Sequence, residues 1–205
     1  MAILTWYGHS CFCLDLGPGG SVIFDPYSPG SVPGTELPEK LEADMVLCSH
    51  QHGDHNAAGR VRLTGKKPAF RLTLLDSFHD PDKGAKRGEN KIALVEYEGF
   101  RAVHLGDLGC ALSGTQIDAL READLLLIPV GGFFTIGPDE AAAVCEQLQP
   151  RVIVPMHYRR GEMGFNVLTP LDAFTGRYAG CTEVPGNVLE IGPDTSGLYV
   201  LNLRK

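Results

Sequence analysis

The sequence lacks any apolar run approaching the ~20 residues that a membrane-spanning helix needs, although 43% of its 205 residues are hydrophobic. Its beginning, MAILTWYGHS, also lacks the basic segment and the small-residue cleavage site of a secretory signal. Export and membrane insertion are therefore not indicated. We expect a cytoplasmic protein with no membrane partner.

Paired cysteines and positive charge are scarce as well. The six cysteines stand at 11, 13, 48, 110, 145 and 181 without a CxxC pair. A strand would place Cys11 and Cys13 on one face, so we expect reduced thiols instead of disulfides. Because 18 basic residues face 25 acidic ones, the formal net charge is −7. A phosphate-binding surface needs a basic excess, so no nucleic-acid partner is expected.

Apolar alternation and buried-looking runs predict strands in both halves of the chain. The expected strands cover about 2–7, 10–16, 21–24, 45–49, 69–78, 92–99, 100–106, 125–130, 152–156, 187–191 and 198–203, with a hairpin turn at Glu98–Gly99. The expected helices cover about 38–43, 114–122, 138–148 and 170–179. No linker divides the chain, so one α/β domain over residues 1–205 is expected, with two sheets face to face and helices outside.

The segment SHQHGDH at 49–55 concentrates side chains that can bind metal. On an extended segment, His50 and His52 project to the same side and can share one ion. Asp54 and His55, which follow Gly53, can serve a second ion nearby. A solvated polar loop or a single structural zinc is the alternative, but structural zinc sites usually bring paired cysteines. The H-x-H-x-D-H pattern therefore favours a catalytic metal site.

Three further candidate ligands, His79, Asp107 and His157, stand at the ends of expected strands. His79 is either a ligand or an exposed loop residue. Asp107 follows an apolar strand, where an unpaired buried carboxylate would be costly and a metal would offset that cost. The same reasoning applies to His157, which ends the run VIVPMH.

These motifs together resemble the metallo-β-lactamase superfamily, whose central motif is HxHxDH. The likeness also includes YGHSCF at 7–12, IFDPY at 23–27, FHD at 78–80, HLGD at 104–107, GGFFTIGPDEA at 131–141 and PMHY at 155–158. Within this superfamily the chain looks most like the branch of short hydrolases that includes ascorbate-phosphate lactonase.

The resemblance implies a four-layer αββα sandwich that holds two divalent cations per chain. Zinc is favoured, with manganese or iron as alternatives, because nitrogen and oxygen ligands without thiolate suit all three. The implied ligands are His50, His52 and His79 for the first cation, Asp54, His55 and His157 for the second, and Asp107 as the bridge between them.

Other polar residues are candidates for supporting roles. Asp25 either accepts a hydrogen bond from a ligand histidine, as outer carboxylates do, or forms a turn before Pro26. His104 either lines the site or supports it from the core. His9 either approaches the ligands from outside or is a structural turn residue.

Basic side chains flank the expected ligands. Lys83 and Arg87 lie in the loop at 81–90, which ends at Asn90, and Arg159 follows His157. In an acidic protein these four residues favour binding of an anionic substrate. Ordinary solvated loop charges are the alternative.

The expected function is metal-dependent hydrolysis of a small, anionic ester, lactone or phosphoester. A hydroxide bridging the two cations would attack the substrate, with Asp54 and Asp107 as the catalytic carboxylates and Asp54 orienting the hydroxide. A nuclease or other phosphodiesterase of the same superfamily is one alternative, although such enzymes generally carry an added domain. A non-catalytic metal-binding protein is the other.

Overall fold

The computed structural model describes residues 1–203, and its first sheet has five strands in the order β13-β1-β2-β3-β5. They are β1 (Ala2–Gly8), β2 (Cys11–Asp15), β3 (Ser21–Phe24), β5 (Met45–Leu47) and β13 (Val188–Ile191). Neighbours are antiparallel except β3 and β5, which run parallel. The strands β1, β3 and β5 therefore share one direction.

The second sheet has seven strands in the order β12-β14-β11-β10-β9-β8-β7. They are β7 (Arg71–Phe78), β8 (Glu89–Tyr97), β9 (Phe100–His104), β10 (Leu125–Pro129), β11 (Val152–Met156), β12 (Thr182–Glu183) and β14 (Gly197–Val200). The strands from β9 to β12 in this order run parallel, whereas β8 is antiparallel to both β7 and β9. The hairpin between β8 and β9 turns at Glu98–Gly99, as the sequence predicts.

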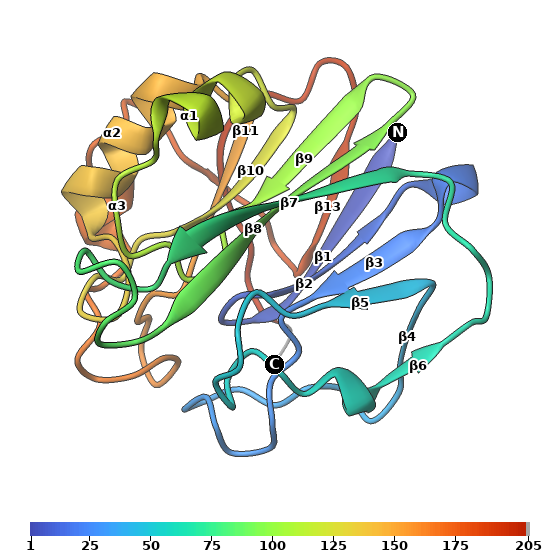
Figure 1. Cartoon of the computed structure of the whole chain (residues 1–205), viewed down its shortest axis with the longest axis horizontal. Coiled ribbons are helices and arrows are strands. Elements are labelled where there is room, and N and C mark those ends of the chain that lie inside the picture. Colours follow the sequence, from blue (N-terminus) through green and yellow to red (C-terminus); the bar gives the residue numbers. More distant parts are fainter. Residues whose placement is uncertain (204–205) are drawn as a thin grey trace.

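The α-helices cover the outer face of the seven-stranded sheet (Figure 1). They are α1 (Gly114–Leu120), α2 (Pro138–Leu148) and α3 (Asp172–Thr175). Ser113 caps α1 by accepting a hydrogen bond from the Gln116 amide. Because β10 and β11 lie between these helices and the other sheet, every residue of both strands is buried. The helix expected over 170–179 is real but shorter.

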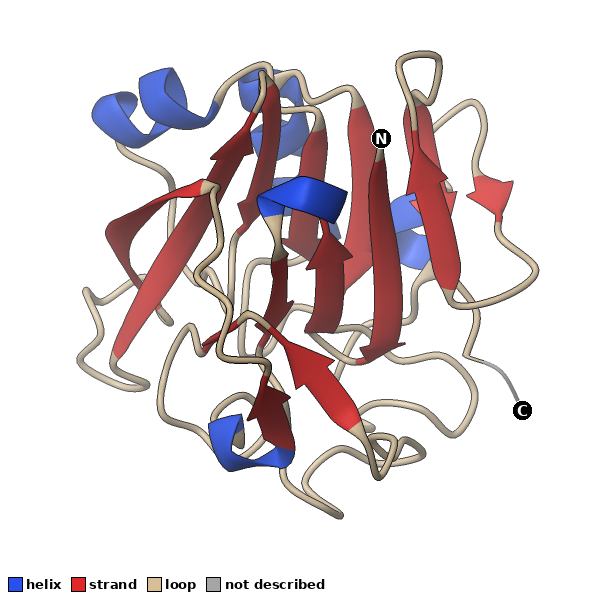
Figure 2. Cartoon of the chain, turned by 90° about the vertical axis from the view of Figure 1, so that its right-hand side faces the viewer, coloured by secondary structure: helices blue, strands red, loops and turns tan. Residues whose placement is uncertain are grey.

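A small sheet replaces an α-helical layer on the other outer face. It pairs β4 (Leu41–Ala43) with β6 (Val61–Leu63), near the 3-10 helix η2 (Ala58–Arg60), and Figure 2 shows this group at the end of the molecule away from α1–α3. The helix expected at 38–43 is therefore wrong. Tyr27, Val32 and Leu41 form an apolar cluster with Cys11 and Ile23 of the five-stranded sheet, which closes this face.

The main core lies between the two sheets. Alternate residues of β1 and β2, including Leu4, Trp6 and Phe12, face the buried side of the seven-stranded sheet. The two closing strands divide between the sheets, with β13 beside β1 and β14 beside β11. The expected face-to-face arrangement is confirmed, and none of the described helices is long and apolar enough to cross a membrane.

The contribution of core packing to stability can be measured at Leu126, which is fully buried in β10. We expect Leu126→Ala to lower the free energy of unfolding by about 2–5 kcal/mol, because it leaves a cavity. Leu63→Ala on β6, where the side chain is 55% exposed, should change it by less than about 0.5 kcal/mol. Urea denaturation measures both, and equal losses would contradict the burial of β10.

Candidate metal centre

One edge of the sandwich collects nearly all of the chain's histidines. His9 follows β1, Asp25 follows β3 and the segment 49–55 follows β5 in the five-stranded sheet. His79 follows β7, Asp107 lies beyond β9 and His157 follows β11 in the seven-stranded sheet. These strands share a direction within each sheet, so their carboxyl ends meet at this edge.

The carboxylate of Asp107 lies at the middle of the cluster and is 1% exposed. Its Oδ2 stands 3.0 Å from Nε2 of His157 and 3.1 Å from Nε2 of His79. The Nε2 atoms of His55 and His50 follow at 3.3 Å and 4.0 Å. A single oxygen thus faces four imidazoles from both sheets.

Two groups of side chains flank Asp107. His50, His52 and His79 have ligand atoms within 4.8 Å of one another, and so do His9, Asp54, His55 and His157. His52 is exposed whereas His50 and His79 are buried. The family resemblance implies two ligand sets of three among these residues, and the structure brings together both sets, with His9 added to the second.

Buried hydrogen bonds fix how the rings are turned. Asp25 Oδ2 lies 2.9 Å from Nδ1 of His55 and accepts from the hydroxyl of Ser49 at 2.7 Å. The Ser49 hydroxyl is also 2.9 Å from Nδ1 of His50. His79 Nδ1 faces the carbonyl oxygen of Phe134 at 3.0 Å. In these three histidine rings the Nδ1 atom has a hydrogen-bond partner, and the Nε2 atom is left directed toward Asp107.

Asn90, expected to contact a substrate, instead holds the Asp107 backbone, so that expectation is wrong. The residue is fully buried on β8. Its Oδ1 accepts from the Asp107 amide at 2.9 Å, and its Nδ2 donates to Ser77 and to the Leu105 carbonyl. Both N–H donors of this amide are used within the protein, and the buried side chain is out of reach of a ligand. Gly106 is required beside it, because a Cβ there would stand 2.3 Å from Asn90 Oδ1.

His104 belongs to the core, one of the two roles that the sequence left open. Its Nε2 lies 3.0 Å from the Ser10 carbonyl, and its Nδ1 accepts from the Gly106 amide at 3.0 Å. The ring stacks on Phe24 with centroids 4.8 Å apart. Both nitrogens are used, so His104 links the two sheets and supports the Asp107 turn from behind.

Burial and charge set the protonation states in this cluster. Burial lowers the pKa of His9 to about 4 and that of His50 to about 3. Burial alone would raise the pKa of Asp107, but the imidazoles of His157 and His55 hold it well below its usual range. Burial alone would lower the pKa of His55 and His79, but the Asp107 carboxylate raises both. A cation that binds here would therefore displace protons from these two rings, because neutral imidazoles and an ionised carboxylate are the forms that bind metal.

The chemistry of the donor set fits divalent cations. Buried polar atoms without a hydrogen bond among residues 1–203 include Nε2 of His50, His55 and His157 and Oδ1 of Asp107. Buried polar atoms nearly always have a hydrogen-bond partner or a ligand in native proteins. Several unpaired nitrogen and oxygen atoms close together therefore indicate a binding site for a cation. Nitrogen and oxygen atoms without thiolate suit Zn²⁺, Mn²⁺ or Fe²⁺.

The loop after His79 is built on Asp80, whose role the sequence analysis missed although it follows His79 in the FHD motif. The buried Asp80 carboxylate accepts four backbone amides, those of residues 82, 84, 86 and 87. This arrangement fixes Arg87, whose guanidinium lies 5.6 Å from the ring centroid of Phe134. Lys83 is exposed in the same loop.

A cavity of about 490 Å³ opens beside the cluster and is lined by His50, His52 and Arg87 among others. Phe134 and Phe165, both half-buried, lie next to each other near the cluster, with the Phe165 ring 5.8 Å from that of His9. Arg159 does not line this cavity, and its Nε donates to the Leu168 carbonyl. Only Arg87 of the expected basic contacts borders the opening.

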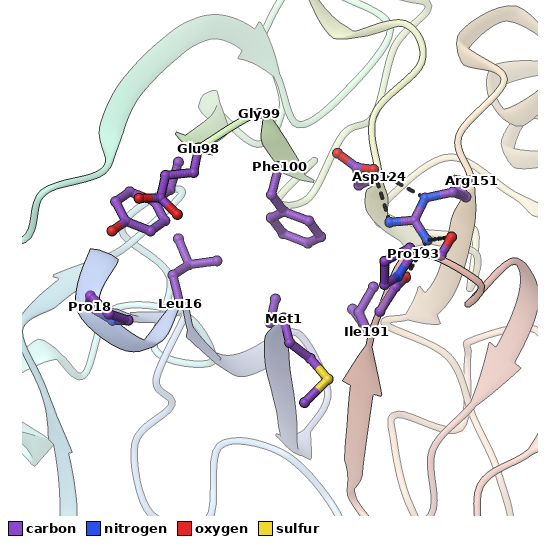
Figure 3. Close-up of a pocket in the computed structure, with 13 residues that line it drawn as sticks. Met1, Leu16, Pro18, Glu98, Gly99, Phe100, Asp124, Arg151, Ile191 and Pro193 are labelled. Carbon is purple, nitrogen blue, oxygen red and sulfur yellow. Dashed lines mark hydrogen bonds and ion pairs between the residues drawn. The ribbon is translucent and has the colours of Figure 1, made fainter.

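A second hollow, of about 370 Å³, lies at the opposite edge, where the parallel strands begin (Figure 3). It is bordered by Met1, Leu16 and Phe100 and contains no histidine or cysteine. Arg151 and Asp124 at its rim pair with each other at 2.9 Å. Arg151 also donates to backbone carbonyls, so this hollow offers no comparable chemistry.

Sequence comparison gives a family for this arrangement. A model of the "Beta-lactamase superfamily domain" matches residues 3–157. Relatives named metal-dependent hydrolase include one from Methanoculleus marisnigri, 27% identical over 95% of this chain and 99% of its own length. Another, from Methanopyrus kandleri, is 26% identical over 76% of this chain and 83% of its own.

Structural comparison agrees with the sequence match. A Thermotoga maritima crystal structure, titled as a candidate Zn-dependent hydrolase of the metallo-β-lactamase superfamily, is 33% identical to this chain. The match covers 100% of both chains with a TM-score of 0.79. By sequence match, by fold and by the positions of its histidine motifs, the chain belongs to the metallo-β-lactamase superfamily.

Proposed function

We propose that this protein, a metal-dependent hydrolase like its named relatives, cleaves a small anionic ester, lactone or phosphoester. One observation carries the proposal. A buried carboxylate oxygen of Asp107 faces four imidazole nitrogens at 3.0–4.0 Å. Two histidine-rich groups of ligand atoms stand on either side of it, which is the donor arrangement that a pair of divalent cations requires.

The ligand assignment follows these two groups. His50, His52 and His79 hold one cation, and Asp54, His55 and His157 hold the other. Asp107 bridges the two. Zinc suits the donors best, and manganese or iron is compatible with them.

The cations, when bound, lower the pKa of a coordinated water and polarise the substrate oxygen. Asp54, whose side chain is 20% exposed, accepts a hydrogen bond from the attacking water and orients it. The Phe134 and Phe165 rings form an apolar wall that excludes other water from the reacting group. Exclusion of water strengthens every charge interaction in the site.

Arg87 supports an anionic substrate. Its side chain borders the cavity beside His50 and His52, and its backbone is fixed by Asp80 at 2.7 Å. A guanidinium pairs well with carboxylate and phosphate groups. A phosphorylated sugar lactone, the substrate class of the lactonase that the motifs resemble, meets this requirement, and Lys83 and Arg159 are secondary candidates for contacts.

The proposal extends to the setting of the enzyme. Residues 1–205 act as one cytoplasmic domain on a small molecule, without nucleic acid or membrane. A panel of p-nitrophenyl acetate, p-nitrophenyl phosphate, bis(p-nitrophenyl) phosphate and sugar lactones tests the activity. Preference for the diester would favour a phosphodiesterase, and metal binding without turnover on any member would favour a non-catalytic protein.

Asp107→Ala should abolish turnover and reduce bound metal from two equivalents to one or none, because it removes the bridging carboxylate. Elemental analysis of protein purified without chelator or nickel measures the metal. The metal-free variant should still fold but unfold at a lower temperature, since the substitution removes one partner of a buried pairing between the carboxylate and the surrounding imidazoles. Asp118→Ala on the exposed side of α1 is the matched control, and wild-type turnover in Asp107→Ala would refute the bridging role.

Asp25→Asn should weaken metal affinity about 10- to 100-fold, the usual effect of removing an outer partner of a ligand. The amide has a single accepting oxygen and its nitrogen only donates, whereas both oxygens of Asp25 accept, so His55 and Ser49 lose their common anchor. Titration against a competing chelator measures the affinity. Asp15→Asn, at an exposed turn on the opposite edge, should leave the metal affinity unchanged. Equal affinities for the wild-type protein and both variants would contradict the proposed role of Asp25.

Arg87→Ala should raise KM for p-nitrophenyl phosphate about tenfold and change kcat little, since a hydrogen bond to a charged group contributes about 1.5–3 kcal/mol. KM for the neutral p-nitrophenyl acetate should not change. Lys86→Ala is the control, because Lys86 lies in the same loop but pairs with Asp82. A flat KM for the phosphate would mean that Arg87 is an ordinary loop charge.

A further inference from the structure

His9 lies inside the second ligand group, although the sequence suggested at most an outer position. Its Nε2 stands 3.4 Å from Oδ2 of Asp54. The His9 ring centroid is 4.1 Å from that of His157 and 5.2 Å from that of His55. The ligand atoms of all four residues lie within 4.8 Å of one another.

The backbone around His9 is held in an unusual conformation that directs the ring to this place. His9 has φ of 51°, a left-handed value that costs free energy for a residue other than glycine. The Trp6 indole donates to the His9 carbonyl at 3.1 Å, which ties the turn to the core. Strain of this kind persists where the surrounding structure determines it, often at functional sites.

The His9 imidazole has no other use in the described part of the chain. The residue is 2% exposed, and neither Nδ1 nor Nε2 makes a hydrogen bond within residues 1–203. An imidazole that served only to shape a turn would expose its nitrogens or pair them with the backbone, as His104 does. The unpaired Nε2 is aimed instead at Asp54, His55 and His157.

We propose that His9 Nε2 is a direct ligand of the cation held by Asp54, His55 and His157, an inference that rests on the proposed metal centre. Two neighbouring ligands at ~2.1 Å from one five-coordinate ion stand roughly 3.0–3.6 Å apart. The Nε2–Oδ2 separation of 3.4 Å between His9 and Asp54 matches this spacing.

The added ligand makes the two cation positions unequal. The position at His9 has four residues besides the bridging Asp107, and three of these four are buried. The position at His50, His52 and His79 has three, of which His52 is exposed. Closed donor sets are typical of tightly held ions, and open sets leave room for water and substrate. The cation at His9 therefore binds first and more tightly, and the substrate meets the cation at His52.

The competing role for His9 is to donate a hydrogen bond to Asp54 and orient it. A positioning role and a ligand role both lower metal affinity when His9 is lost, so affinity alone does not separate them. Cobalt(II) does, because proton resonances of an imidazole bound directly to the ion are shifted far outside the normal range. A ring that only touches a ligand gives no such signal.

The test compares wild-type protein with His9→Gly, since glycine readily adopts the left-handed backbone at this position. Each is loaded with cobalt(II) and measured by chelator competition and by proton NMR. Wild-type protein should bind two equivalents. His9→Gly should lose one shifted ring resonance and weaken one equivalent by more than ~100-fold, and added imidazole should restore both. Asp25→Asn is the control, because it should weaken affinity without losing a resonance.

The outcomes separate the two proposals. If wild-type protein binds fewer than two cobalt ions, the dinuclear centre of the proposed function fails. The ligand role of His9 fails with it if no cobalt binds, or if the single bound ion gives the same shifted resonances in His9→Gly. If wild-type protein binds two and His9→Gly keeps every shifted resonance, His9 only positions Asp54 and the ligand assignment is wrong. Thermal unfolding of the metal-free variant shows whether the turn has survived the substitution.

Discussion

The buried carboxylate of Asp107 is the constraint on which the site depends. An ionised carboxylate removed from water costs several kcal/mol unless it is paired, and here four imidazole nitrogens at 3.0–4.0 Å surround one of its oxygens. Those imidazoles come from both sheets. The two sheets must therefore pack with the carboxyl ends of β5, β7, β9 and β11 at one edge, and the core between them fixes that register.

Polar contacts behind the candidate ligands hold these ligand side chains in place. Asp25 and Ser49 fix the rings of His55 and His50, and Asn90 fixes the Asp107 backbone. These contacts are buried, so breaking any of them leaves an unsatisfied group. Backbone strain occurs here too, since His9, Asp25 and His157 have φ of 51°, 46° and 54°. These features at the edge lower the free energy of unfolding, and the apolar core between the sheets offsets that loss.

The ligand candidates could be predicted from the sequence because each follows a recognisable strand or lies in the HxHxDH segment. Asn90 could not, since it ends a loop rich in charge and glycine, yet β8 begins at Glu89 and turns its side chain inward. The helix expected at 38–43 failed because this short segment pairs with β6 and closes an apolar cluster. The position of His9 depends on a left-handed turn and on rings far away in the chain. Such tertiary features leave no local pattern.

One loop carries both a side chain of the proposed apolar wall and a backbone carbonyl that orients a proposed ligand. Parallel strands place the candidate ligands at this edge. The loop after β7 carries Arg87, which borders the cavity, and the loops after β10 and β11 carry Phe134 and Phe165, whose rings lie near Arg87 and His9. Loops normally vary without disturbing the scaffold. Here the Phe134 carbonyl also holds Nδ1 of His79 at 3.0 Å, so a change in the aromatic wall would turn a proposed ligand. The loop that carries Phe134 is therefore less free to vary than its exposure suggests, because its backbone orients a proposed ligand of the metal centre.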